Sequence, residues 1–162
     1  MVVKMKNIIT FIKMCFFPVL IMSPLLAKGH HSFAMFDSSQ FMLVEGTVLR
    51  WNFNSPHSWL YIEALDAQGD LVEWGFEAGS PINAMRNGVT GNTFQRGERI
   101  KVVMNRIRTG AASGAICFAQ KEDDLIVRPN NNSTCDSVGI AARWTEEGWL
   151  ENAAHLESHP AN

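Results

Sequence analysis

Basic residues, cysteines and long apolar segments are all scarce in this sequence of 162 residues. Its 14 Lys and Arg are fewer than its 16 Asp and Glu, so the formal net charge is −2. This balance argues against a nucleic-acid-binding protein, because such proteins neutralise phosphates with clustered basic side chains. No uninterrupted apolar run approaches the roughly 20 residues of a transmembrane helix. We therefore expect no stable membrane span in the mature protein.

Residues 1–29 have the pattern of an export signal. Three lysines precede the apolar stretch Met14–Leu26, which two prolines interrupt. Signal peptidase prefers small residues at the end of the leader, so we expect cleavage after Ala27 or after Gly29. A retained membrane anchor is the alternative, and the lysine and prolines inside the run disfavour it. The sequence therefore predicts a periplasmic or secreted protein.

The mature chain is long enough for one domain. Cleavage after Ala27 removes three of the 14 basic residues and none of the 16 acids, which leaves a net charge of −5. The remaining chain of about 135 residues can bury one core and is too short for two comfortable ones. We expect a β-domain over residues 30–128 and a polar tail over residues 129–162, with a short helix around residues 141–156 and disorder at its end.

Two of the three cysteines remain after export, Cys117 and Cys135. An even pair in an oxidising compartment favours a disulfide, which would contribute about 3 kcal/mol. Free thiols are the alternative. A metal site made of these two residues alone is disfavoured, because nothing near them has zinc-site spacing.

Short segments with apolar residues at every second position dominate the β-domain, and this alternation predicts strands. The expected strands are Leu43–Trp51, Ser58–Leu65, Leu71–Glu77, Arg99–Asn105 and Ala115–Gln120, with an extension at Leu125–Val127. Ser80, Pro81 and Gly88 mark a short helix between the third and fourth strands. Three strands, a helix and two strands is the element order of the OB-fold. We therefore expect an all-β fold with one short helix, an OB-fold-like five-stranded Greek-key barrel.

Several separate motifs carry a resemblance to a known family. They are "HHSFAMFD", "VEGTVLRWNFNSPHSWLYIE", "WGFEAGSP" and "FQRGERIKV". With them the chain resembles a family of small exported bacterial proteins known only as a domain of unknown function, over His30 to Val103. The resemblance implies export and a compact β-domain, and it brings no activity and no catalytic residues. The chain departs from the family pattern after Gln120, so the tail with Cys135 is an addition.

Histidines at the expected mature amino terminus form the first candidate site. If cleavage follows Gly29, His30 offers its α-amine and its ring to one metal ion, with His31 beside it. His57, in the "NFNSPH" loop, could then complete a three-nitrogen site suited to Cu(II). If cleavage follows Ala27, the amine of Lys28, two amides and the His30 ring would form a square-planar site for Cu(II) or Ni(II). In the structural alternative, His57 caps a turn and the terminal pair is solvated.

An aromatic and basic face, defined as Trp51, Trp59, Tyr61, Arg99 and Lys101, is the second candidate site. Alternation points Trp59 and Tyr61 outward from the second expected strand, and Arg99 and Lys101 outward from the fourth. Such a face could bind an anionic or sugar-like ligand, or a partner protein. A solvated charged edge that discourages aggregation would explain the same residues.

The sequence does not favour an enzyme. No serine or cysteine has the surroundings of an activated nucleophile, and no motif places a carboxylate pair for acid–base chemistry. His155 and His159 fall in the tail and are not candidates. We therefore expect a binding or accessory module, with copper as the candidate cofactor and a small ligand or partner protein as the alternative.

Overall fold

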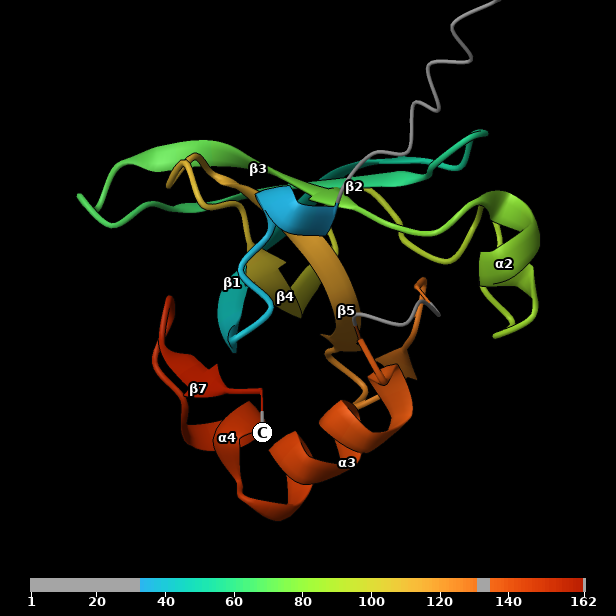
Figure 1. Cartoon of the computed structure of the whole chain (residues 1–162). Helices are drawn as coiled ribbons and strands as arrows, with labels where there is room; N and C mark the ends of the chain where they lie inside the picture. The colour runs from blue at the N-terminus through green and yellow to red at the C-terminus, as the bar shows by residue number, and fades with distance from the viewer. Residues whose placement is uncertain (1–32, 131–134, 162) are drawn as a thin grey trace, which may run out of the picture. The chain divides into compact units, whose positions relative to one another are not determined.

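A computed structural model describes residues 33–130 and 135–161, which form a mostly β structure with a few short helices (Figure 1). The strands are β1 (Gln40–Asn52), β2 (Trp59–Leu65), β3 (Leu71–Glu77), β4 (Arg99–Arg106), β5 (Ser113–Lys121), β6 (Ile126–Val127) and β7 (Ser158–Pro160). The helical segments are η1 (Phe33–Met35), α2 (Pro81–Met85), α3 (Ser137–Glu146) and α4 (Trp149–Asn152).

Five strands form a closed ring. Hydrogen bonds connect them in the order β1, β2, β3, β5, β4 and back to β1. All neighbours are antiparallel except β3 and β5. The ring can close because β1 is long: its residues 42–47 pair with β4 and its residues 47–52 pair with β2. β6 extends the sheet beside β5, and β7 extends it beside β1.

The five expected strands and the short helix are confirmed, with boundaries shifted by at most three residues. Ser80 caps α2 by accepting a hydrogen bond from the Asn83 amide at 3.4 Å, and Pro81 is the first helical residue. Gly88 adopts a left-handed conformation with φ of 76° just after the helix. The local turn and capping chemistry therefore sufficed to place this element.

The ring encloses the main hydrophobic core. Alternate residues of every strand point inward, including Val44, Leu60, Trp74, Val102 and Ile116, all fully buried. The alternation that predicted the strands therefore also identified their inner faces.

Gly46 of β1 lies tightly against β2. A Cβ atom at this position would lie 2.4 Å from the carbonyl oxygen of Glu63 and 2.8 Å from the Cβ of Ala64. Both neighbours belong to β2 and cannot move away without breaking the ladder that closes the ring. A register irregularity between Val48 and Arg50 bends β1 just beyond this point.

The C-terminal tail covers a second hydrophobic core on the outer face of the ring. Phe41, Leu43 and Val103 face outward from β1 and β4, and Trp144 and Leu150 of the tail bury them. The tail thus contains two helices rather than one, separated by Gly148 in a left-handed conformation with φ of 68°. The last residues, expected to be disordered, pair with β1 as β7.

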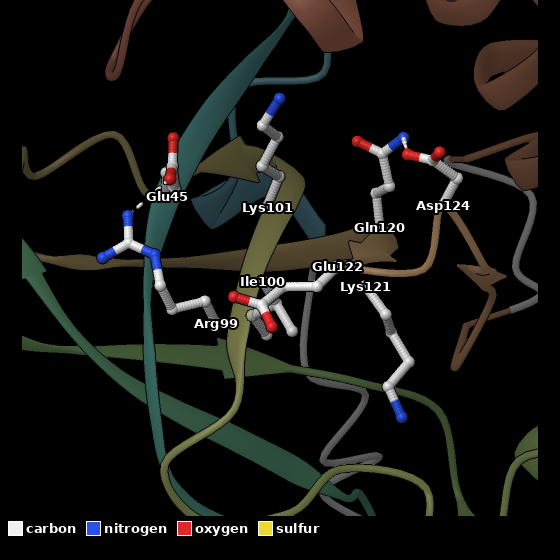
Figure 2. Close-up of a pocket in the computed structure, with 8 residues that line it drawn as sticks. All are labelled: Glu45, Arg99, Ile100, Lys101, Gln120, Lys121, Glu122 and Asp124. Atoms are coloured by element: carbon white, nitrogen blue, oxygen red, sulfur yellow. Dashed lines mark hydrogen bonds and ion pairs between the residues drawn. The ribbon is translucent and has the colours of Figure 1, made fainter.

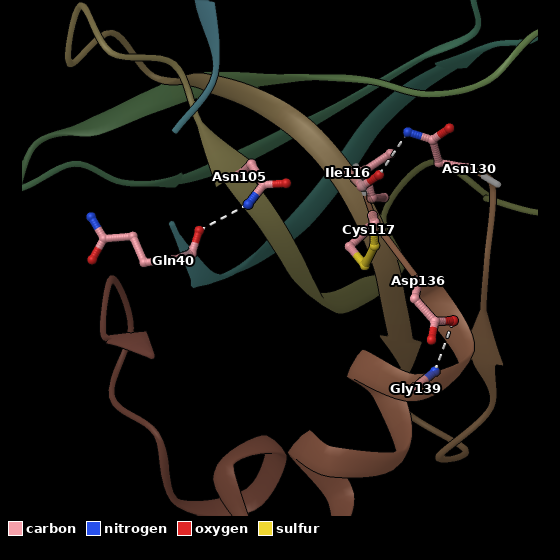
Figure 3. The surroundings of a disulfide bond; sticks show 8 residues. Gln40, Asn105, Ile116, Cys117, Asn130, Asp136 and Gly139 are labelled. Atoms are coloured by element: carbon pink, nitrogen blue, oxygen red, sulfur yellow. Dashed lines mark hydrogen bonds between the residues drawn. A yellow bond between two sulfur atoms is a disulfide. The ribbon is translucent and has the colours of Figure 1, made fainter. Parts of the chain in front are cut away.

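A disulfide joins the ring to the tail, as the sequence predicted (Figure 3). Cys117 of β5 and Cys135 have Cα atoms 5.7 Å apart and are separated by 18 positions in the chain. Both are buried in the outer core. Next to Cys135, the Asp136 side chain accepts a hydrogen bond from the Gly139 amide at 3.1 Å and caps α3 (Figure 3).

None of the helices in the described part of the chain is long and apolar enough to cross a membrane.

Gly46→Ala should destabilise the protein by more than about 2 kcal/mol, because the new methyl group would press on the β2 backbone. Chemical denaturation monitored by circular dichroism measures this loss. Gly91→Ala is the matched control, since a Cβ there would meet only the Phe53 side chain, at ordinary contact distances of 3.7 Å from Cδ1 and 3.8 Å from Cβ. Equal stability of the two variants would contradict the close approach at Gly46.

Candidate functional site

His57 and Glu77 form a side-chain pair at one end of the β2–β3 hairpin. Nδ1 of His57 contacts Oε1 of Glu77, and the side chains are 34% and 13% exposed. The register of the hairpin creates this contact, because Trp59, two residues after His57, pairs with Glu77. Backbone hydrogen bonds between Ser58 and its neighbours Ala78 and Gly79, of 2.9 and 3.1 Å, continue the ladder past the strand ends. The histidine loop is therefore fixed to the end of β3.

The pair has the arrangement seen in many metal-bound histidines. A carboxylate that accepts a hydrogen bond from Nδ1–H fixes the neutral tautomer with its lone pair on Nε2. It also raises the basicity of the ring as a ligand. The Glu77 side chain is 13% exposed and lies beside the ring, where a carboxylate favours a cation over an anion.

A cavity of about 290 Å³ lies next to the pair. Its polar lining comes from His57, Glu77 and the neighbouring residues Ser80, Asn83 and Asn130, and its apolar lining includes Phe33. Asn130 is held in place because its side-chain amide donates to the Ile116 carbonyl at 3.2 Å (Figure 3). The cavity thus joins the β1–β2 loop, the end of β3, the start of α2 and the first described residue of the chain.

The segment that begins at Phe33 is attached to the residues that directly follow β4. The amide of Arg108 donates to the Met35 carbonyl at 2.9 Å, and its side chain donates to the Ala34 carbonyl at 3.1 Å. Phe36 forms a β-bridge with Ile107. These contacts direct the start of the described chain toward the cavity beside His57.

Asp37 stabilises the turn after this segment. Its carboxylate accepts hydrogen bonds from the hydroxyl and the amide of Ser39, at 2.6 and 3.1 Å. These bonds lower the pKa of the Asp37 carboxyl below its usual value, and Arg108 at 3.8 Å acts in the same direction. Asp37 therefore stays ionised and keeps the turn closed under ordinary conditions.

His30 and His31, the predicted ligands at the amino terminus, lie outside the described residues. Within residues 33–130 and 135–161, no group of three His, Cys, Asp or Glu side chains could hold a metal ion.

The residues of the predicted aromatic and basic face lie at three separate places in the structure. Trp59 and Tyr61 stack side by side on the outer face of β2, with ring centroids 6.1 Å apart. The guanidinium of Arg50 lies 3.6 Å from the centroid of Tyr61 and donates two hydrogen bonds to Glu73, of 2.6 and 2.7 Å. One face of Tyr61 is therefore already covered by a fixed cation.

Trp51 lies elsewhere, as the second-last residue of β1. Its indole nitrogen donates to the Thr90 carbonyl at 2.9 Å, and its ring packs against Phe53 and Phe94 with centroids 5.6 and 5.2 Å apart. These contacts give Trp51 a structural role in holding the loop before β4.

Arg99 and Lys101 line a cavity of about 200 Å³ on another part of the ring (Figure 2). Arg99 forms an ion pair with Glu45 at 2.6 Å, and Nζ of Lys101 donates to the carbonyl oxygen of Leu150 in the tail. Gln120 and Asp124, which also line the cavity, form a hydrogen bond of 3.2 Å with each other (Figure 2). The cations are thus engaged by the protein itself.

Sequence reasoning missed Glu77 as a partner of His57, although the signal was present. Counting outward from the "DAQGD" turn pairs Leu65 with Leu71 and, six positions further on each strand, Trp59 with Glu77. That register alone brings the carboxylate next to the histidine loop.

The model of one protein family, described as "Family of unknown function (DUF6152)", matches residues 19–117 of the chain. Neither a curated protein nor a solved structure matches the chain.

Replacing Arg50 by Gln should raise the pKa of Glu73 toward its ordinary value, because hydrogen bonds from Arg50 are what lower it. A lowered carboxyl pKa stabilises the fold above the unfolded-state value of about 4.3, and this stabilisation is lost as the pH falls below about 4. NMR titration of the Glu73 carboxyl measures the change. Arg99→Gln, which removes the partner of Glu45, should leave Glu73 unchanged; an equal shift in both variants would contradict the assignment.

Proposed function

The chain belongs to the family of unknown function DUF6152, and we propose that it is an exported accessory module that binds copper through His57 and the mature amino-terminal residue His30. The observation that supports this proposal most is that Phe33 and His57 line the same cavity. His30 is three residues before Phe33, so its Cα lies at most about 11 Å from that of Phe33. This short covalent link permits the approach of His30 and His31 to the loop histidine that the proposal requires.

Nitrogen ligands select the metal. His30 at the amino terminus supplies its α-amine and its ring, and His57 supplies Nε2. Three nitrogen ligands in a plane suit Cu(II), which prefers tetragonal sites. If the mature chain begins at Lys28, the amine, two amides and the His30 ring supply a nitrogen plane for the same metal. His31 is the adjacent ligand in either case.

Glu77 completes the site as the partner of His57. Its carboxylate accepts a hydrogen bond from Nδ1–H, orients the ring and leaves Nε2 as the coordinating nitrogen. Its charge also offsets part of the charge of a divalent ion. The protein's contribution in this proposal is to bind and hold the metal.

The location of His57 fits a ligand site if the strand ring is an OB-type barrel, which is part of the proposal. The ring order and the helix between its third and fourth strands support that interpretation. The loop between the first two strands of this fold is a usual ligand-binding edge. Export is supported by the leader pattern and by the disulfide, which persists in oxidising compartments.

A metal-free module that binds an anionic or sugar-like ligand, or a partner protein, is the second candidate. The stack of Trp59 on Tyr61 favours it. Arg50 already covers Tyr61, and Arg99 and Lys101 are engaged with Glu45 and Leu150 at another place. Copper binding at His57 is therefore the function that the geometry supports better.

The exported protein should begin at His30 or Lys28 and bind one equivalent of Cu(II). Intact mass spectrometry identifies the first residue, and electron paramagnetic resonance follows a titration with Cu(II). With His30 first, His57→Ala should weaken binding by about 100-fold or more, because one of three nitrogen ligands is lost. His159→Gln, an imidazole of the tail, is the control. A mature chain that begins beyond His31 would rule out the site, and unchanged affinity would remove His57 from it.

Glu77→Gln should weaken Cu(II) binding by about 10- to 100-fold, the usual effect of losing the carboxylate behind a ligating histidine. Glu73→Gln makes the same charge change two pairs away on the same outer face of β3 and should leave the affinity within about twofold. The comparison uses the same titration. If both variants weaken binding equally, Glu77 acts only through its charge.

A further inference from the structure

The ladder between β1 and β2 stops where the two strands separate. Its last pair at this end is Thr47 with Glu63. Continuing the same register by two residues on each strand would pair Glu45 with Leu65. Instead, β1 turns toward β4, where Glu45 pairs with Lys101, and β2 continues beside β3. The amide of Glu45 and the carbonyl of Leu65 therefore face a gap too wide for a direct hydrogen bond.

The imidazole of His155, from the C-terminal tail, occupies this gap. The amide of Glu45 donates to Nδ1 of His155 at 3.1 Å, and Nε2 of His155 lies 2.8 Å from the carbonyl oxygen of Leu65. The imidazole thus replaces the missing hydrogen bond between β1 and β2, and it connects these two strands to the tail.

These two contacts specify one protonation state. Nδ1 receives an N–H and must carry a lone pair, whereas Nε2 faces a carbonyl and must carry the proton. Only the neutral ring with its proton on Nε2 satisfies both. A protonated ring has a proton on each nitrogen, so it would lose the bond to Glu45 and set two N–H groups against each other.

We propose that His155 is a proton-sensitive clasp that holds the end of the C-terminal tail on the strand ring. Protonation breaks the bridge between β1 and β2 and weakens the adjacent backbone bonds. These bonds run from the Leu156 amide to the Leu43 carbonyl at 2.8 Å and from the Leu43 amide to the Glu157 carbonyl at 3.1 Å. Below them lies the outer core with Leu43 and Leu150, which detachment would expose.

The charged side chains around the His155 imidazole do not compensate the charge of the added proton. Glu45 of β1, Glu63 of β2 and Arg99 of β4 line the cavity of about 320 Å³ that His155 borders. Glu45 is already paired with Arg99 at 2.6 Å, and Glu157 of the tail accepts the Ala154 amide at 2.7 Å. Among the described residues, no carboxylate lies within ion-pair distance of His155. Lowering the pH therefore disfavours the docked tail.

Release by protonation is local. The other end of the tail is bound to β5 through the disulfide between Cys117 and Cys135. Acid therefore opens residues near α4 and β7 while the start of α3 stays attached. The inference is independent of copper, since it concerns residues outside the proposed metal site.

Hydrogen exchange followed by NMR tests the clasp. In the mature protein, the protection factor of the Glu45 amide, which corrects for the intrinsic exchange rate, should fall about tenfold or more between about pH 7.5 and about pH 5. His155→Gln carries a donor and an acceptor on a side chain of similar length and does not titrate. In this variant the protection should be independent of pH, whatever its absolute value.

His159→Gln is the matched control, because His159 is the other imidazole of the tail and stacks on Trp149 with centroids 4.0 Å apart. Its Glu45 amide should lose protection with acid as the parent protein does. The proposal is overturned if the parent keeps its protection at low pH, if His155→Gln loses protection equally, or if His159→Gln abolishes the loss.

Discussion

The closure of the ring through β1 is the constraint on which the rest of the structure depends. One strand has to pair with β2 and with β4, and it does so by bending after Gly46, where no side chain fits. The bend has two results. It carries the end of β1 into the loop with His57, and it opens the gap between β1 and β2 that His155 fills. The proposed metal site and the clasp are thus consequences of the same strand.

The pairing between β2 and β3 determines the chemistry of the site. Its outer face carries, in order, Glu63 beside Glu73, Tyr61 beside Gly75 and Trp59 beside Glu77. Two of these carboxylates have positively charged or basic partners of different kinds. Glu73 binds the guanidinium of Arg50, which is permanently charged and has only donor groups, so the guanidinium offers no atom to a metal ion. Glu77 binds an imidazole, which has a second nitrogen able to coordinate a metal. This difference is why we propose a metal ligand at His57 and a structural role for Arg50.

The sequence predicted the strands, the short helix and the disulfide because each rests on local signals or on counting. Alternation identifies a strand by its own residues, and Ser80 and Pro81 identify a helix start. The tail was harder to predict, since its helices are stabilised by an outer face of the ring that local patterns do not reveal. One signal was available: Val102, Val103 and Met104 are consecutive apolar residues, which indicates burial on both faces of β4.

The partners of the histidines could not be predicted by the same means. His57 was identified as a candidate from its loop, while its contact with Glu77 depends on the register across a hairpin. His155 was set aside because it lies in the tail, and its role depends on a gap between two strands 20 positions apart in sequence, at Glu45 and Leu65. Side chains that join distant segments are specified by the complete fold rather than by their neighbours. A bridging histidine in a closed β-structure is therefore best sought where a ladder register predicts a pair that the strands do not form.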